Sequence, residues 1–429
     1  MTSASPVVII EPSPDTPLVW FDIAIRGGGA SDPIGVEGLH RHSALLARRG
    51  TRTHDRAALD GELDALGAAL DITVSRDAIT LSGLCLSRHL DRVIELTAAI
   101  LGEPRFDADE HARLLRETPQ VLDEVRDDDN ALATRWFDWL CAPGHPYSRT
   151  ALGTAASLAK IDRDTAAALW RRELVADNLV IGLAGDIDEA SAARAADRLT
   201  ARLPAGPRPT LPDGAGYVAP RGRRLFVVDK PDRTQAQLRI GHQSIPYGHA
   251  DTAAIALAEA VLGGMFSSRL MQEIRVKRGW SYGAGCALRR SKLAHWFELW
   301  TAVAIEVTAP AIALVLEQYG DFATRGPSDD EVDFARSYLI GAMPFHVATA
   351  RQRMQLEVRD AIFDLPRGFT ANLPAALAQL SAADVRAACA RSLRADDAMT
   401  VAITTASAVA PTLTDRTLGT LQVVAHDAY

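Results

Sequence analysis

The chain has 429 residues, of which 48% are hydrophobic and 23% charged, as expected for a globular protein of two or more domains. Its net charge of −8, with only short basic clusters, argues against a nucleic-acid-binding role. The four cysteines stand singly without a Cys-x-x-Cys pair, which argues against a thiolate zinc site and favours a reducing compartment.

The N-terminal segment predicts a cytoplasmic location. It has no basic region at its start, and its apolar run at residues 7–10 is far shorter than a signal sequence or a membrane span requires. We therefore expect a cytoplasmic protein that does not contact a membrane.

Residues 35–51 predict a helix that carries two histidines near its start, His40 and His42. Two helical ligands of one metal ion must lie one turn apart, at positions i and i+4. His40 and His42 are two residues apart, which separates them by about 200° around a helix. Between His40 and Gly50 there is no Gly or Pro to break the helix. The pair is therefore predicted to be two polar residues at a helix N-terminal end.

Two stretches about 220 residues apart share one order of features, at residues 157–186 and 376–406. Each predicts a short apolar turn, an N-cap residue, an amphipathic helix, an Ala-Asp break and a strand. The predicted caps are Asp162 and Ser381, whose side-chain oxygens can accept free backbone N–H groups. Acidic helix starts near residues 110 and 330, and alternating strands near residues 20 and 237, repeat the same offset. The sequence therefore predicts an internal repeat.

A stretch rich in Pro and Gly separates the two halves, as a linker does. We predict an N-terminal domain at residues 1–204, a linker at 205–222 and a C-terminal domain at 223–429. The fold class is α+β: two tandem homologous domains, each a mostly antiparallel sheet with helices packed on one face.

Residues 261–286 predict a Gly-rich turn, a helix over 269–277 and then a strand. Leu270, Met271 and Ile274 form the inward face of that helix, and Gly279 follows its end. The Gly-Gly pair lacks the Gly-x-x-x-x-Gly-Lys-Ser/Thr spacing of a phosphate-binding loop, so phosphate binding is not expected here.

Residues 35–51 resemble the zinc-binding helix of the M16, or pitrilysin-type, metallopeptidases. That family has the inverted zincin motif His-x-x-Glu-His, closed by Gly-Thr. Aligned on Gly50 and Thr51, the first metal-binding His falls on Arg41, the catalytic Glu on Ala44 and the second His on Leu45. His40 and His42 flank the ligand position and do not occupy it.

The resemblance places the third zinc ligand of the family on a later helix, where Glu124 fits the position. One carboxylate cannot hold a catalytic zinc, which needs three protein ligands, and Ala44 cannot activate water as the family's Glu does. The resemblance therefore implies no zinc in this chain, with Glu124 as a remnant on the surface or in a salt bridge. An autonomous metal enzyme using His40, His42 and Glu124 is the weakest interpretation.

The C-terminal half is similar to the second functional motif of M16 proteins, an Arg and a Tyr seven residues apart. Here the pair is Arg275 and Tyr282. In the family these side chains contact the substrate near the zinc. A guanidinium offers fixed donors to a peptide carbonyl, and a phenol can donate to the oxyanion that forms at the scissile carbonyl. The alternative is an Arg in a helix salt bridge and a Tyr in the core of the sheet.

Taken together, the resemblance implies the pitrilysin/LuxS-like metallohydrolase fold and a bacterial protein that is inactive alone. The expected function is the non-catalytic subunit of a heterodimeric M16 peptidase: Arg275 and Tyr282 complete the site of a homologous partner that binds zinc. The pair would cleave peptide substrates in a closed chamber. The alternative is a structural pseudoenzyme without a role in proteolysis. Substrate identity stays open at this point.

Overall fold

The computed structural model describes residues 5–204, 206–214, 216–293 and 296–428, which form two compact units. The first unit contains the described residues of Met1–Leu122, Arg149–Asp213 and Pro344–Ala371. The second contains those of Asp123–Ser148, Gly214–Met343 and Asn372–Tyr429. Each unit therefore takes one short segment from the other half of the chain. The boundaries of the sequence repeat stay a prediction, and residues 205 and 215 of the predicted linker lie outside the described residues.

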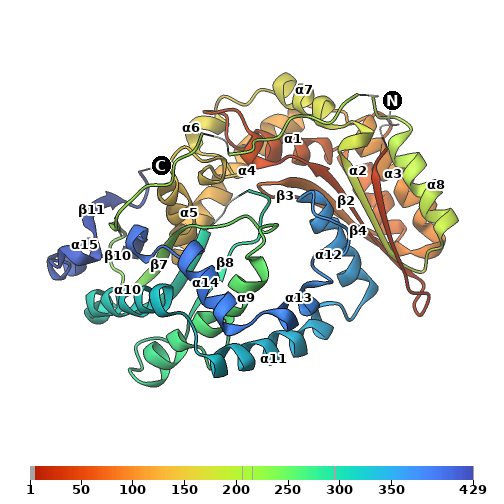
Figure 1. Cartoon of the computed structure of the whole chain (residues 1–429). Coiled ribbons are helices and arrows are strands. Elements are labelled where there is room, and N and C mark those ends of the chain that lie inside the picture. The colour runs from red at the N-terminus through yellow and green to blue at the C-terminus, as the bar shows by residue number, and fades with distance from the viewer. Residues whose placement is uncertain (1–4, 205, 215, 294–295, 429) are drawn as a thin grey trace. The chain divides into compact units, whose positions relative to one another are not determined.

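The first unit is built on a sheet with the strand order β1-β5-β2-β4-β3. Figure 1 labels its strands β2, β3 and β4. The strands are β1 (Val7–Pro12), β2 (Leu18–Arg26), β3 (Ala69–Val74), β4 (Ala78–Leu86) and β5 (Leu179–Gly185). Only the β1–β5 pairing among these is parallel. The helices of this unit are α1 (Leu39–Ala47), α2 (Arg56–Ala65), α3 (Leu90–Gly102), α6 (Ala155–Leu158), α7 (Arg163–Glu173), α8 (Glu189–Thr200) and α12 (Ala350–Ile362). Helix α4 (Ala108–Asp127) continues from this unit into the second.

Alternation along β5 divides its side chains between the two faces of the first sheet. Ile181 and Leu183 join the core beneath α1, α3, α7 and α8. Val180 and Ala184 face the other way and pack against Met354 and other apolar side chains of α12. The predicted fold class is confirmed, and the structure adds this one helix of the C-terminal half on the opposite face.

Gly182 of β5 permits the close approach of α12. A Cβ atom at this position would lie 2.4 Å from Sδ of Met354 and 2.5 Å from Cγ2 of Val358. We expect Gly182→Val to push α12 off the sheet and to lower the free energy of unfolding by about 1–3 kcal/mol. Gly61 of α2 has no heavy atom within 4 Å of the same virtual Cβ, so Gly61→Ala is the control. It should stabilise the protein by about 0.5–1 kcal/mol in the same chemical denaturation experiment.

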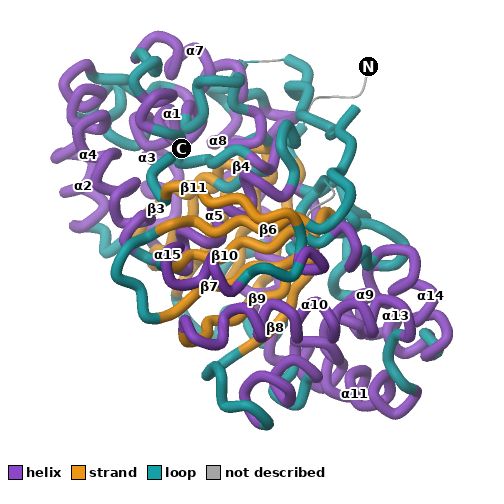
Figure 2. The backbone as a smooth tube through the Cα atoms, turned by 90° about the vertical axis from the view of Figure 1, so that its left-hand side faces the viewer, coloured by secondary structure: helices purple, strands orange, loops and turns teal. Residues whose placement is uncertain are grey.

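The second unit repeats this topology. Its sheet has the order β11-β6-β10-β7-β9-β8, and Figure 2 shows these strands following one another in that order. The strands are β6 (Arg224–Asp229), β7 (Gln235–Gln243), β8 (Ala284–Leu288), β9 (Trp296–Ala304), β10 (Met399–Thr404) and β11 (Thr420–Ala425). Without β11, the order β6-β10-β7-β9-β8 matches β1-β5-β2-β4-β3 position by position, and the single parallel pair recurs at β6–β10. The predicted repeat therefore corresponds to two sheets of one topology.

The helices of the second unit include α5, which comes from the N-terminal half of the chain. They are α5 (Asp129–Cys141), α9 (Thr252–Glu259), α10 (Thr308–Arg325), α13 (Leu373–Gln379), α14 (Ala382–Ser392) and α15 (Ala406–Val409), while α11 (Asp329–His346) ends in the first unit. Charged groups fasten α5 to the sheet. Asp138 of α5 accepts a hydrogen bond from Trp296 at 2.7 Å and lies 2.6 Å from Arg289, and Arg239 of β7 donates to the side-chain oxygen of Asn130 on α5.

Two further features of the structure concern the cysteines and the apolarity of the helices. All four cysteines are buried and free, as expected for small hydrophobic side chains in a core. Among the described residues, no helix has the length and apolarity needed to cross a lipid bilayer.

Candidate functional site

The three motif positions on helix α1, Arg41, Ala44 and Leu45, carry none of the groups that a zinc site would need. It begins after Gly38, whose φ of 93° favours glycine, and continues to Ala47. Ala44 is fully buried, whereas Arg41 and Leu45 are half-buried, one turn apart on the same face. Burial, followed by the neighbouring Arg49, lowers the pKa of Arg41. A cation and a leucine on this face do not fit zinc, and among the described residues no three His, Cys, Asp or Glu side chains are arranged to hold a metal ion.

His40 lies in a buried ionic network rather than at the surface. Its Nδ1 atom is 2.6 Å from Asp32 Oδ1, and its Nε2 atom is 3.8 Å from Glu173 Oε1. The three side chains are each at most 2% exposed. Burial alone would lower the pKa of His40, but the hydrogen bond with Asp32 and the nearby carboxylate of Glu173 outweigh it and raise that pKa. Burial likewise opposes the charge on Glu173, yet His40 and Arg172 hold its pKa below the ordinary value. The network therefore favours the charged form of His40.

Asp32 also shapes the start of α1. Its carboxylate accepts hydrogen bonds from the backbone N–H of Gly38 at 2.7 Å and of His40 at 2.9 Å. These are N–H groups at the start of α1, where free donors and the helix dipole favour an anion. Asp32 thus takes the place of an ordinary N-cap side chain, because Gly38 has none.

His42 is the uncharged counterpart of His40. It is 2% exposed, and its Nε2 atom lies 2.8 Å from Nδ1 of His111 on α4. Burial, followed by the proximity of His111 and nearby arginines, lowers the pKa of His42 to about 4. Sequence reasoning described both histidines only as polar residues at a helix end. The structure buries both, each against a partner far along the chain.

Glu124 lies on the exposed surface of α4, within the second unit, whereas Arg41, Ala44 and Leu45 belong to the first. Its neighbour Asp123 pairs with Arg126 at 3.0 Å on the same helix. The remnant of the metal motif is therefore an exposed carboxylate.

In the segment that contains Arg275, the helix and the following strand form as predicted, but Gly263 and Gly264 lie in a π-helical segment and not in a turn. Leu270, Met271 and Ile274 are buried, and Gly279 has a φ of 63° beyond the helix end. The structure adds two π-helical segments that the sequence did not indicate, at Ala260–Gly264 and Met271–Val276. Such segments recur at functional sites.

Arg275 and Tyr282 are both exposed on the second unit. Tyr282 is 92% exposed, so it is not part of the core of the sheet. The guanidinium carbon of Arg275 lies 4.9 Å from the centroid of the Phe266 ring. Sequence reasoning missed Phe266, although an aromatic residue after Gly-Gly at an exposed turn is an unusual feature that could have been noticed.

The π-helical segment that contains Gly263 and Gly264 packs against the edge strand β8. A Cβ at Gly263 would lie 2.3 Å from the backbone N of Cys286, so only glycine fits there. Glu259 of α9 accepts a hydrogen bond from the backbone N–H of Leu288 at 3.1 Å. Burial raises the pKa of Glu259 to about 7. Gly263 therefore serves the close packing of this segment against β8.

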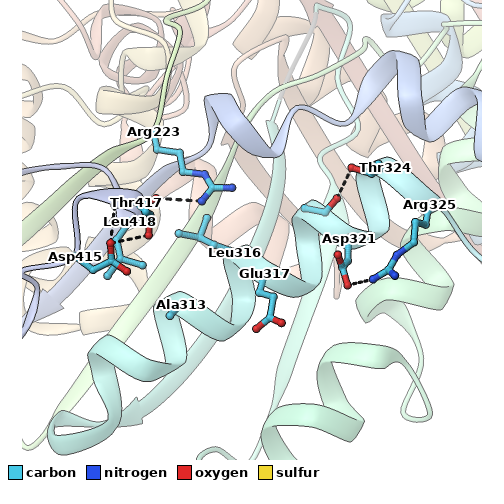
Figure 3. A pocket seen from close by; sticks show the side chains of 11 residues that line it. Arg223, Ala313, Leu316, Glu317, Asp321, Thr324, Arg325, Asp415, Thr417 and Leu418 are labelled. Carbon is cyan, nitrogen blue, oxygen red and sulfur yellow. Dashed lines mark hydrogen bonds and ion pairs between the residues drawn. The ribbon is translucent and has the colours of Figure 1, made fainter.

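A cavity of about 560 Å³ lies elsewhere in the second unit, beside α10 and the turn before β11 (Figure 3). Arg223 donates to the carbonyl of Thr417 at 3.1 Å, Asp415 accepts from the Thr417 hydroxyl at 2.7 Å, and Asp321 pairs with Arg325. None of these lining residues belongs to a segment that the sequence analysis singled out.

Comparisons with known sequences agree with the two motifs. Residues 7–142 match the family profile described as insulinase, peptidase family M16, and residues 160–339 match the one described as peptidase M16 inactive domain. A non-peptidase homolog, YmxG, of Helicobacter pylori is 24% identical over 85% of this chain and 84% of its own length. An uncharacterized zinc protease of Mycobacterium tuberculosis is 26% identical over 78% of this chain and 76% of its own length.

Solved structures share the fold. A crystal structure of a peptidase M16 inactive domain from Pseudomonas fluorescens superposes with a TM-score of 0.86 at 23% identity, covering 94% of this chain and 96% of that one. A protease from Helicobacter pylori superposes with a TM-score of 0.82 at 16% identity, covering 92% and 96%. The two profile matches together span well over half of the sequence, and both describe the same family. The chain belongs to the M16 peptidase family.

Proposed function

We propose that this chain is the non-catalytic subunit of a heterodimeric, zinc-dependent M16 peptidase. The observation that supports this proposal is that one of the two family motifs has lost its functional residues, whereas the other has them. The zinc positions hold Arg41, Ala44 and Leu45, whereas Arg275 and Tyr282 are present and exposed. A chain that served only as a scaffold would have no need to keep the second motif in solvent. The partner would be a homologous chain of similar length that carries His-x-x-Glu-His and binds the zinc.

The roles of the two side chains follow from their chemistry. The Arg275 guanidinium would donate hydrogen bonds to a carbonyl of the peptide substrate and so fix its position. The Tyr282 hydroxyl would donate to the oxyanion that develops as water adds to the scissile carbonyl. Neither group takes part in bond breaking, which the partner's zinc and Glu would perform.

The names of relatives support the same reading. The Helicobacter pylori relative is named a non-peptidase homolog, and other bacterial relatives are named zinc proteases. A further relative is a mitochondrial-processing peptidase subunit beta, 26% identical over 67% of this chain. The alternative, a structural pseudoenzyme, agrees with the lost zinc motif but gives no reason for an exposed Arg275 and Tyr282. Assembly in the bacterial cytoplasm is part of the proposal.

Metal analysis tests this proposal. The purified chain is expected to contain no zinc after dialysis. After co-expression with a zinc-motif M16 chain from the same genome, the two should co-purify with about one zinc per pair, because only one subunit has the ligands. Stoichiometric zinc in this chain alone would contradict the proposal. Failure of the two chains to associate would favour the structural alternative.

A further inference from the structure

We propose that Phe266 is a positioning residue that holds the Arg275 guanidinium ready for substrate, an inference that rests on the proposed function. The contact is the stacking of the Arg275 guanidinium over the Phe266 ring at 4.9 Å. A ring face attracts a cation without neutralising it, so the N–H donors of the guanidinium remain available.

The charges of this segment set Arg275 apart from its neighbours. Glu331 pairs with Arg269 at 2.6 Å. Glu273 pairs with both Lys277 and Arg278. Arg275 has no hydrogen bond or ion pair to any carboxylate among the described residues, although Glu273 is only two positions away. A carboxylate partner would occupy the donors that a peptide carbonyl needs.

Arg269 shows what a purely structural arginine looks like in the same segment. Its guanidinium also stacks on a ring, that of Phe322 at 5.0 Å, but the ring is fully buried and Glu331 takes two of its donors. The ring beneath Arg275 is instead 67% exposed. Phe266 thus contributes little to the core, and its contact with Arg275 is the feature that accounts for an aromatic side chain here.

The backbone keeps Phe266 at the surface. It lies in the turn between the two π-helical segments, and its flanking residues Met265 and Ser268 are 7% and 1% exposed. The N–H of Ser268 donates to the carbonyl of Met265 at 3.1 Å and closes the turn. Buried anchors on both sides therefore present the ring to solvent. A fixed ring limits the rotamers of Arg275, which reduces the entropy lost when the guanidinium binds substrate.

The test uses the assembled pair and an unstructured peptide substrate. Phe266→Leu, which keeps the apolar bulk but removes the ring, should lower kcat/KM about five- to thirtyfold, the range for a cation–π contact that bound substrate desolvates. Phe266→Tyr should restore activity. In the Arg275→Ala background, Phe266→Leu should have no further effect, because the ring acts only through the guanidinium. Phe334→Leu is the matched control, since Phe334 is also exposed, at 58%, on α11.

Two outcomes would overturn the inference while leaving the proposed function intact. One is wild-type activity of Phe266→Leu in a pair that Arg275→Ala disables. The other is a loss with Phe266→Leu that persists in the Arg275→Ala background. If Arg275→Ala itself has no effect, the proposed function fails instead.

Nuclear magnetic resonance of the chain alone tests the contact without activity. In a sample with labelled arginine, the side-chain protons of Arg275 should show an upfield ring-current shift. The shift should disappear in Phe266→Leu and remain in Phe334→Leu. Its absence from the wild-type spectrum would overturn the inference, whatever the activity of the pair.

Discussion

Replacing Tyr282 with phenylalanine in the assembled pair is expected to lower kcat/KM by about 100- to 1,000-fold, as removal of one oxyanion donor does in other hydrolases. Tyr282→Phe removes only the hydroxyl of a side chain that is 92% exposed, so the fold of the chain should not change. Arg275→Ala should cause a loss of similar size, with a larger share in KM, because the guanidinium binds the ground-state carbonyl as well. Steady-state kinetics with a fluorogenic peptide measures both effects.

Lys277→Ala is the matched control for these variants. Lys277 lies in the same segment and is 61% exposed, but its charge pairs with Glu273 one turn away. Such surface pairs contribute at most about 1 kcal/mol. The control should therefore keep wild-type kinetics. Equal losses in all three variants would point to damage of the segment rather than to transition-state binding.

Asp32→Asn is expected to lower the free energy of unfolding by about 3–5 kcal/mol, the cost of breaking a buried ion pair. Asp32 is 2% exposed and holds both the start of α1 and the His40 ring, which is fully buried. An asparagine would leave the His40 charge without its nearest counterion. Chemical denaturation measures the loss. Asp188→Asn, at the exposed cap of α8, is the control, because Asn caps a helix as well as Asp does.

The same network gives stability a defined pH dependence. The folded pKa of His40 is raised, so its contribution is fully present below the ordinary value of 6.5 and is lost as the pH rises through the folded pKa. His42 acts in the opposite direction: its pKa of about 4 removes stability as the pH falls from 6.5 toward 4. Unfolding free energies above pH 6.5 exclude His42, but they still include Glu259, whose folded pKa of about 7 also lowers stability as the pH rises. His40 is isolated by the difference between two proteins: the fall above pH 6.5 should be smaller in His40→Gln than in the wild type, and equal slopes would contradict the assignment.

Local signals in the sequence predicted most of the fold. Asp162 and Ser381 cap their helices as predicted, with the N–H of Thr165 at 2.7 Å and of Asp384 at 3.2 Å. Caps and strand alternation depend on residues close in the chain, so they can be read without a structure. The position of α12 could not be predicted from the sequence. An amphipathic helix shows that one of its faces is buried, but it does not show which sheet that face covers.

The candidate site divides in the same way. The motif positions of Arg275 and Tyr282 could be assigned from the sequence because their segment resembles the second functional motif of the M16 family. The ionic network around His40 could not be predicted from the sequence, because Glu173 lies 133 residues further along the chain. The stacking of Arg275 on Phe266 depends on a π-helical turn, which side-chain periodicity does not indicate.

The most direct test of the account is a titration of peptidase activity. A zinc-loaded M16 partner from the same genome is mixed with increasing amounts of this chain. We predict that neither protein alone cleaves the peptide, that activity rises to a plateau at equal amounts, and that this chain with Arg275→Ala and Tyr282→Phe still binds the partner but yields almost no activity. Full activity of the partner alone, or with the doubly substituted chain, would contradict the claim that this chain completes the partner's site.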